Sequence, residues 1–137
     1  MVAYVKVAGG IAAKDGAINA GVDQWAFGLT NAAPSGTAFV AGTTDLATSG
    51  GYTAGGTNVA TTSFTEAAGV AKLILAAPTL WTASGGGFTF RYVLLINKTN
   101  NLVMGYWDNG TSIVMNGTNA DTFAFTPDPT NGVWTDQ

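Results

Sequence analysis

Few side chains in this sequence could carry out acid–base or nucleophilic chemistry. Histidine and cysteine are both absent, which excludes a histidine general base, a serine–histidine pair, a thiolate nucleophile and a zinc–thiolate site. The serines have no activating partner, and neither Lys14 nor Lys72 is spaced to act as one. We therefore expect a protein that is not an enzyme.

The carboxylates offer the next possibility, because two of them can hydrolyse a glycosidic bond. The candidates are Glu66, Asp108, Asp121 and Asp128. All but Glu66 lie in turn-like contexts, where an aspartate bonds to nearby backbone, so a structural role is favoured. A calcium site from Asp108, Asn109 and Asp121 is conceivable but has no EF-hand spacing. No metal or cofactor is expected.

The glycine-rich stretch SGGYTAGGTNV (49–59) raises the question of phosphate binding. Gly51 and Gly56 have the interval of a Walker-type loop, but Thr57 and Asn58 stand where lysine and serine or threonine are needed. No helical pattern follows to bind an anion at its N-terminus. The stretch is interpreted as a shaped loop between strands, in which Gly51, Gly55 and Gly56 supply backbone angles that other residues resist.

The low charge of the chain limits its partners. Only 9% of its 137 residues are charged, the net charge is −3, and the five cations are scattered. Nucleic-acid binding needs clustered cations, so it is not expected. No apolar run approaches the roughly 18 residues of a membrane span, and the N-terminus lacks a signal-peptide pattern. We expect synthesis in the cytoplasm and no membrane partner.

The elements that must position these residues all resemble strands. Short apolar or alternating runs lie between turn signals. They are residues 2–7, 24–30, 70–77, 88–97, 102–107, 113–115, 122–126 and 132–135. The alanines of 70–77 would suit a helix, but the run lies between Gly69 and Pro78, and its length favours a strand.

Turns and loops complete this prediction. Residues 88–107 are expected to form a hairpin about the KTNN turn (98–101), and Asp108-Asn109-Gly110 the next turn. Residues 31–61 are predicted to be a long surface loop with one short strand near Phe39. The whole pattern predicts a single all-β domain over residues 1–137, an antiparallel β-sandwich or jelly roll of seven or eight short strands without a substantial helix. Residues 1–10 form an arm or edge strand in this prediction.

The four tryptophans leave one binding function open. Tryptophan can stack on sugars, so a carbohydrate-binding module is an alternative. Trp25 and Trp107 lie within strand patterns, which favours the core, whereas Trp81 and Trp134 lie near strand ends and suit either place.

Three segments carry a resemblance to a known family. They are GYTAGGTNV (51–59), FTFRYVLLINKTNNLVMGYWDNG (88–110) and DTFAFTPDPTNGVWT (121–135). They resemble small virion proteins of tailed bacteriophages, which have a Gly-Tyr-Thr-x-Gly-Gly loop, a return strand similar to LIGYxDxG and a closing GDTF pair. This chain departs from that pattern at Val103-Met104 and at Ala120, and residues 1–49 match much less well.

The resemblance implies a structural protein of the phage particle. We favour a decoration (cement) protein on the capsid surface, with the major capsid protein and a second copy of itself, as a homodimer or other homo-oligomer, as partners. A tail component or a head–tail joining protein is the alternative within the same class. The expected contact residues are Val2, Tyr4 and Val5 of the N-terminal arm and the loop residue Tyr52, because aromatic residues in polar loops are typical anchors. Tyr52 has a second possible role, as a plug that holds its loop onto the sandwich.

Overall fold

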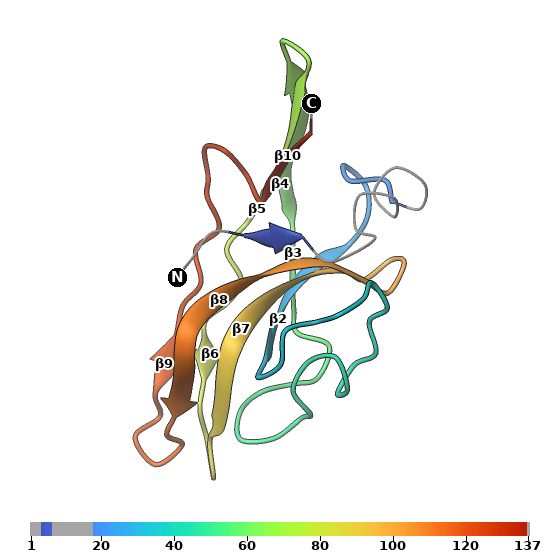
Figure 1. Cartoon of the computed structure of the whole chain (residues 1–137). Helices are drawn as coiled ribbons and strands as arrows, with labels where there is room; N and C mark the ends of the chain where they lie inside the picture. The colour runs from blue at the N-terminus through green and yellow to red at the C-terminus, as the bar shows by residue number, and fades with distance from the viewer. Residues whose placement is uncertain (1–3, 7–17, 137) are drawn as a thin grey trace.

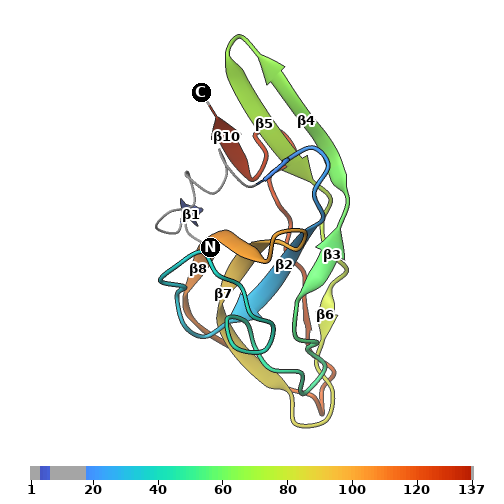
Figure 2. The same cartoon turned by 90° about the vertical axis from the view of Figure 1, so that its right-hand side faces the viewer.

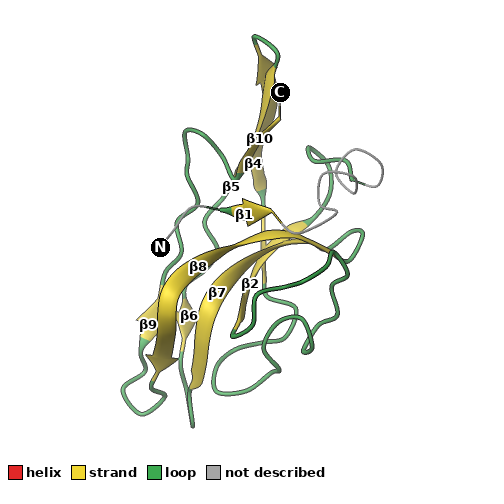
Figure 3. Ribbon diagram, in the orientation of Figure 1, coloured by secondary structure: helices red, strands yellow, loops and turns green. Residues whose placement is uncertain are grey.

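The structure is a computed structural model that describes residues 4–6 and 18–136. Within them, it contains ten strands in three antiparallel sheets and no helix (Figures 1 and 3). The strands are β1 (Val5–Lys6), β2 (Trp25–Thr30), β3 (Thr57–Val59), β4 (Thr61–Ala67), β5 (Val70–Leu75), β6 (Trp81–Thr82), β7 (Phe88–Asn97), β8 (Leu102–Met115), β9 (Thr122–Phe123) and β10 (Trp134–Asp136). The predicted all-β, sandwich-like class is confirmed, and the jelly-roll order stays a prediction.

The main sheet has the strand order β1-β8-β7-β2-β3, and two smaller sheets, β10-β5-β4 and β6-β9, accompany it. One core cluster joins their inner sides, because Trp25, Phe27 and Leu29 of β2 pack with Leu73 of β5 and Trp81 of β6. We call this side of the main sheet its inner face. Burial of so many large apolar side chains is the main stabilising contribution to the fold.

The other side of the main sheet, its outer face, is also apolar. Ala26, Leu94, Ile96 and Val103 form a second cluster with Phe39, which comes from the long 31–56 segment. Figure 1 shows this segment, in cyan and green, running beside the β2 end of the main sheet. The predicted surface loop therefore also covers part of the sheet. Two backbone hydrogen bonds attach it to the start of β8: the Phe39 N–H donates to Asn101 O, and the Val103 N–H donates to Thr37 O.

The β7–β8 hairpin forms as predicted, but the turn expected at Asp108-Asn109-Gly110 does not. Strand β8 continues through these residues, and residues 109–112 form a bulge opposite the single residue Arg91. Gly110 has a φ of +89°, so the Asn-Gly pair supplies the predicted positive φ, but inside a strand. The alternation of inward and outward side chains along β7 shifts by one residue at this bulge. Phe88 and Phe90 face the inner core before it, and Val93 and Leu95 face the same core after it.

Three strands were not predicted: β3, β4 and the two-residue β6. Strand β3 ends the loop, and β4 forms a hairpin with β5 that projects away from the main sheet (Figure 2). Strand β4 is mostly exposed, so it shows no alternation of apolar and polar residues. The ambiguous run at 70–77 is the strand β5, as its length indicated.

The β4–β5 hairpin closes through a two-residue turn whose strained position can be tested. Ala67 pairs with Val70, and both turn residues have positive φ, +54° at Ala68 and +79° at Gly69, as in a type I′ turn. Asparagine adopts this conformation more readily than alanine. We predict that Ala68→Asn raises the free energy of unfolding by about 0.5–1 kcal/mol, measured by urea denaturation. The control Ala67→Asn, one residue outside the turn, should give no gain, and equal gains would contradict the argument.

Candidate functional site

The described carboxylates brace the backbone of turns. Asp23 accepts from the Asn19 N–H, Glu66 from the Gly69 N–H, Asp121 from the Asn116 N–H, and Asp128 from the Thr130 and Asn131 N–H groups. These bonds hold the pKa of Asp128 below its usual value. The predicted bonding of an aspartate to nearby turn backbone is present at Asp121 and Asp128, and it extends to Glu66, whereas Asp108 makes such a bond within a strand bulge. No group of three acidic side chains that could hold a metal ion occurs among the described residues.

Asp108 also carries the clearest ion pair of the described residues. Its two oxygens accept from Arg91 Nε at 2.8 Å and Nη2 at 3.0 Å, and Oδ1 accepts from the Gly110 N–H at 2.7 Å. The Arg91 guanidinium, and then the Gly110 N–H, hold the pKa of Asp108 below its ordinary value. The pair thus bridges the β8 bulge and the residue of β7 that faces it.

Tyr52 is an internal plug. Its side chain is only 1% exposed, and its hydroxyl donates to Asp45 Oδ2 at 2.6 Å and accepts the Leu29 N–H at 3.0 Å. Burial, with the Asp45 hydrogen bond, raises the pKa of Tyr52 well above its usual value. The expectation that Tyr52 contacts a partner is therefore corrected: in this fold its contacts are internal, and the second role considered for it applies.

The glycines around Tyr52 shape this loop. Ser49 and Tyr52 exchange two backbone hydrogen bonds across Gly50 and Gly51, both at positive φ, so SGGY forms a tight turn. A Cβ at Gly50 would lie 1.9 Å from the Gly87 carbonyl oxygen, because the turn is wedged against the chain before β7. The predicted glycine angles are confirmed at Gly51, Gly55 and Gly56.

The two described residues of the predicted N-terminal contact surface point to opposite faces. Tyr4 packs on Trp107, with ring centroids 4.7 Å apart, and reaches the inner core. Val5 is exposed on the outer face, where it pairs with Tyr106 of β8. Val2 lies outside the described residues. Tyr4 therefore holds β1 to the sheet, and of the two described residues Val5 is the one that stays open to a partner.

A strip of aromatic and charged residues extends from Val5 across the outer face. Tyr106 meets Tyr92 of β7 edge-on, with centroids 5.5 Å apart, and the Arg91 guanidinium carbon lies 5.2 Å from the Tyr92 ring centre. Both tyrosines are half-buried. We call Val5, Tyr106, Tyr92, Arg91 and Asp108 the tyrosine strip. Tyrosine and arginine are enriched at the energetic centres of protein interfaces, so this strip suits contact with another protein.

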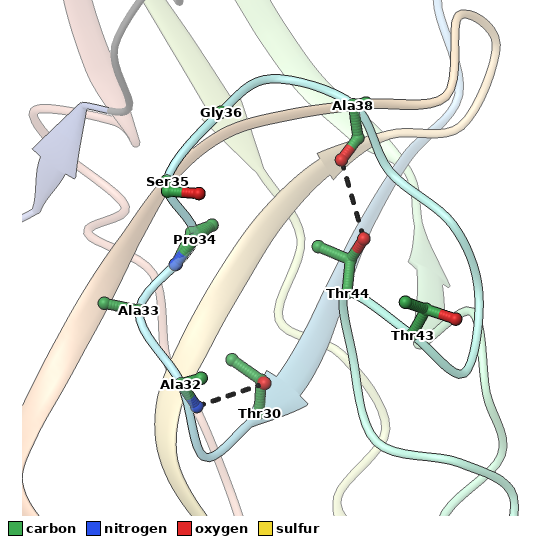
Figure 4. Close-up of a pocket in the computed structure, with 9 residues that line it drawn as sticks. All are labelled: Thr30, Ala32, Ala33, Pro34, Ser35, Gly36, Ala38, Thr43 and Thr44. Atoms are coloured by element: carbon green, nitrogen blue, oxygen red, sulfur yellow. Dashed lines mark hydrogen bonds between the residues drawn. The ribbon is translucent and has the colours of Figure 1, made fainter.

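A shallow hollow of about 340 Å³ lies near the end of the strip. It begins at Thr30, which pairs with Tyr92, and the chain from 32 to 44 curves around it (Figure 4). Its lining residues are Thr30, Ala32, Ala33, Pro34, Ser35, Gly36, Ala38, Thr43 and Thr44. Two hydroxyls are bonded to the loop: Thr30 Oγ1 accepts the Ala32 N–H, and Thr44 Oγ1 donates to Ala38 O. With only small and hydroxyl side chains, the hollow can seat a protruding residue but supplies no acid, base or cation.

The tryptophan side chains that the structure describes lie in the core. Trp25 and Trp81 are buried, and Trp107 packs against the same inner cluster. They offer no exposed row of rings for stacking on a sugar. Within the described residues, no helix is long and apolar enough to cross a membrane.

Comparison with known proteins found no matching family model, no matching curated protein and no matching solved structure. Inferences about function therefore depend on the chain's own residues. Sequence reasoning did not single out Tyr92 or Tyr106. The signal in the sequence was the middle of the run FTFRYVLLIN, residues 92–96, which is apolar on both faces and therefore indicates a strand covered on both sides.

The Tyr52–Asp45 bond gives a direct stability prediction. Tyr52→Phe keeps the buried ring but removes the donor to Asp45 and the acceptor of the Leu29 N–H. We expect the free energy of unfolding to fall by about 2–3 kcal/mol, because two buried polar groups lose their partner. Urea denaturation provides the measurement, with Tyr106→Phe on the outer face as the control at below about 0.5 kcal/mol. Equal losses in the two variants would refute an internal role for the Tyr52 hydroxyl.

Proposed function

We propose that this protein is a structural component of a tailed-bacteriophage virion, a decoration protein that binds the outside of the assembled head. The observation that carries the proposal is the tyrosine strip: tyrosines and an arginine, half-buried and held by their neighbours, on an outer face next to a shallow hollow. The family resemblance of residues 50–135 supports the same class. The described carboxylates are engaged in turns and in one ion pair, which favours a binding role over chemistry.

Such a protein stabilises a capsid by mass action. A ligand that binds only the assembled lattice lowers the free energy of that lattice relative to separated subunits. Each contact with the major capsid protein can be modest, because many copies act together on one particle. A surface with few charges suits this role, since little charge must be desolvated on binding. The proposed location is the capsid surface, and no cofactor is needed.

Two alternatives predict different measurements. A tail or head–tail joining protein would be present in few copies per particle, whereas decoration needs many, so quantitative protein composition of the particle separates them. A carbohydrate-binding module would show quenching of tryptophan fluorescence by sugars. The core positions of Trp25, Trp81 and Trp107 favour the capsid proposal over the carbohydrate alternative.

Particles that lack this protein test the proposed role directly. We expect them to assemble, but to release their DNA at a lower temperature and to be more sensitive to low salt than complete particles. Adding back the purified protein should restore the original midpoint of heat release. Particles as robust as the complete ones would overturn the role in stabilisation.

The tyrosine strip can be tested by a single substitution. Tyr106→Ala should weaken binding to assembled heads at least tenfold, about 1.4 kcal/mol, because it removes the centre of the strip. A matched control is Val114→Ala, an exposed residue on the same strand outside the strip. Binding to protein-free heads is measured by co-sedimentation, and folding of both variants by thermal denaturation. Unchanged affinity of a folded Tyr106→Ala variant would place the contact surface elsewhere.

A further inference from the structure

Strand β4 is the one described edge strand of this fold that is both long and open. In the sheet order β10-β5-β4 it occupies the outer position, with seven residues. The other end strands are shorter: β1, β6 and β9 have two residues each, and β3 and β10 have three each. In Figure 2, β4 forms the outer side of the projecting hairpin. Its free backbone N–H and C=O groups form a template for pairing with another strand.

Strand β4 has few of the devices by which proteins block such an edge, since its one charged residue is Glu66 near the turn. Its sequence, TTSFTEA, contains no lysine and no proline, and the irregularity between Thr61 and Ser63 leaves residues 63–67 regularly paired with β5. The free edge of β8, by contrast, is interrupted by the bulge at residues 109–112 and partly covered by β1. Bulges and short edge strands prevent pairing, so β4 is the edge left available.

An apolar patch lies beside this edge. Phe64, in the middle of β4, is 42% exposed, and Val22, in the neighbouring turn, is 79% exposed. The turn lies against Phe64 at Gly21, the residue before Val22, because a Cβ on Gly21 would lie 3.4 Å from the Phe64 ring. The open backbone edge and the exposed phenylalanine on it together favour pairing with another strand, which would cover both.

The hairpin geometry determines which groups of β4 face outward. In a hairpin with a two-residue turn, the residues that flank the turn form a hydrogen-bonded pair, here Ala67 and Val70. Bonding alternates along an antiparallel strand, so Thr65 bonds inward to β5, while Phe64 and Glu66 direct their N–H and C=O groups outward. A partner strand must therefore bond to Phe64 and Glu66.

We propose that the partner is a second copy of this chain, paired through β4 in antiparallel orientation with the two-fold axis at Phe64. In this register Phe64 faces Phe64 of the other copy as a hydrogen-bonded pair, and Ser63 faces Thr65. The two Phe64 rings lie on the same side of the joined sheet, where they cover one another. The two three-stranded sheets thereby become one continuous six-stranded sheet.

Charge selects this register over the neighbouring one. A two-fold axis at Thr65 would place Glu66 opposite Phe64 and bring the two Glu66 carboxylates within reach of each other. The Phe64-centred register separates these carboxylates by about four residues along the strands, or roughly 13 Å. The strand is thus self-complementary, which an isologous dimer requires.

The association is measured in solution. We expect sedimentation of the full chain to show concentration-dependent formation of a species of twice 13.9 kDa. Phe64→Lys should remain monomeric, because a lysine on an edge opposes pairing. Val40→Lys, at a loop residue that is 58% exposed, is the matched control and should dimerise like the parent chain. Circular dichroism must show that both variants are folded.

Cysteine cross-linking then tests the register, since the natural chain has no cysteine. Phe64→Cys places two sulfurs across the axis at a Cα separation of about 5.5 Å, within disulfide range. Ser63→Cys and Thr65→Cys are controls, because each is offset from its own copy by two residues. Under mild oxidation Phe64→Cys should form a covalent dimer at least tenfold faster than either control.

Three results would overturn the proposal. They are a chain that stays monomeric up to about 100 µM, cross-linking of Phe64→Cys no faster than Ser63→Cys, and loss of the dimer in Val114→Lys on β8. Fastest cross-linking of Thr65→Cys would refute the Phe64-centred register. The proposal does not depend on binding to a phage head, which is measured separately, so either one can fail alone.

Discussion

The backbone of Leu29, near the end of β2, is where the long loop is attached to the main sheet, and the arrangement of the loop depends on this attachment. Strand β3 pairs with β2 only from Trp25 to Phe27, so the N–H and C=O of Leu29 need other partners. The Tyr52 hydroxyl accepts the N–H, and the Leu46 N–H donates to the carbonyl. The loop thus completes the strand ladder in place of a longer β3. An unpaired pair of buried backbone groups would otherwise cost several kcal/mol.

Asp45 holds the loop in the position from which it pairs with the Leu29 backbone. Its carboxylate is buried and accepts from the Tyr52 hydroxyl and from the Gly42 and Gly55 N–H groups. Two neighbouring contacts hold the same loop, since Lys98 Nζ donates to Gly55 O and lies 5.6 Å from the Phe39 ring centre. One buried carboxylate therefore orders a long glycine-rich segment that has little apolar content of its own. Because the hollow beside Thr30 is formed by this loop, the same contacts fix its shape. A surface that is already ordered loses less conformational entropy on binding.

Sequence reasoning succeeded for the longer strands that bury side chains, and it failed for strands that are exposed, such as β4, or only two or three residues long, such as β6 and β3. Strand β2 and the β7–β8 hairpin were predictable, because Trp25, Phe27 and the run at 92–96 must be covered. Strand β4 could not be found this way, since an exposed edge strand has no apolar alternation to show. A turn was wrongly predicted at Asp108-Asn109-Gly110, because a glycine at positive φ occurs in strand bulges as well as in hairpin turns. The role of Tyr52 depended on Asp45, and no local pattern links those two positions.

The bulge in β8 has a consequence for how this protein can change over evolution. Phe90 pairs with Ile113 on one side of it and Tyr92 with Asp108 on the other, so the two halves of the hairpin keep their own registers. Residues 109–112 contribute no partner to β7, and just before them Asp108 accepts hydrogen bonds from Arg91 and from the Gly110 N–H. Insertions or deletions within this short stretch would leave both registers intact. Length variation among relatives should therefore concentrate there, while the strands on either side keep a constant length.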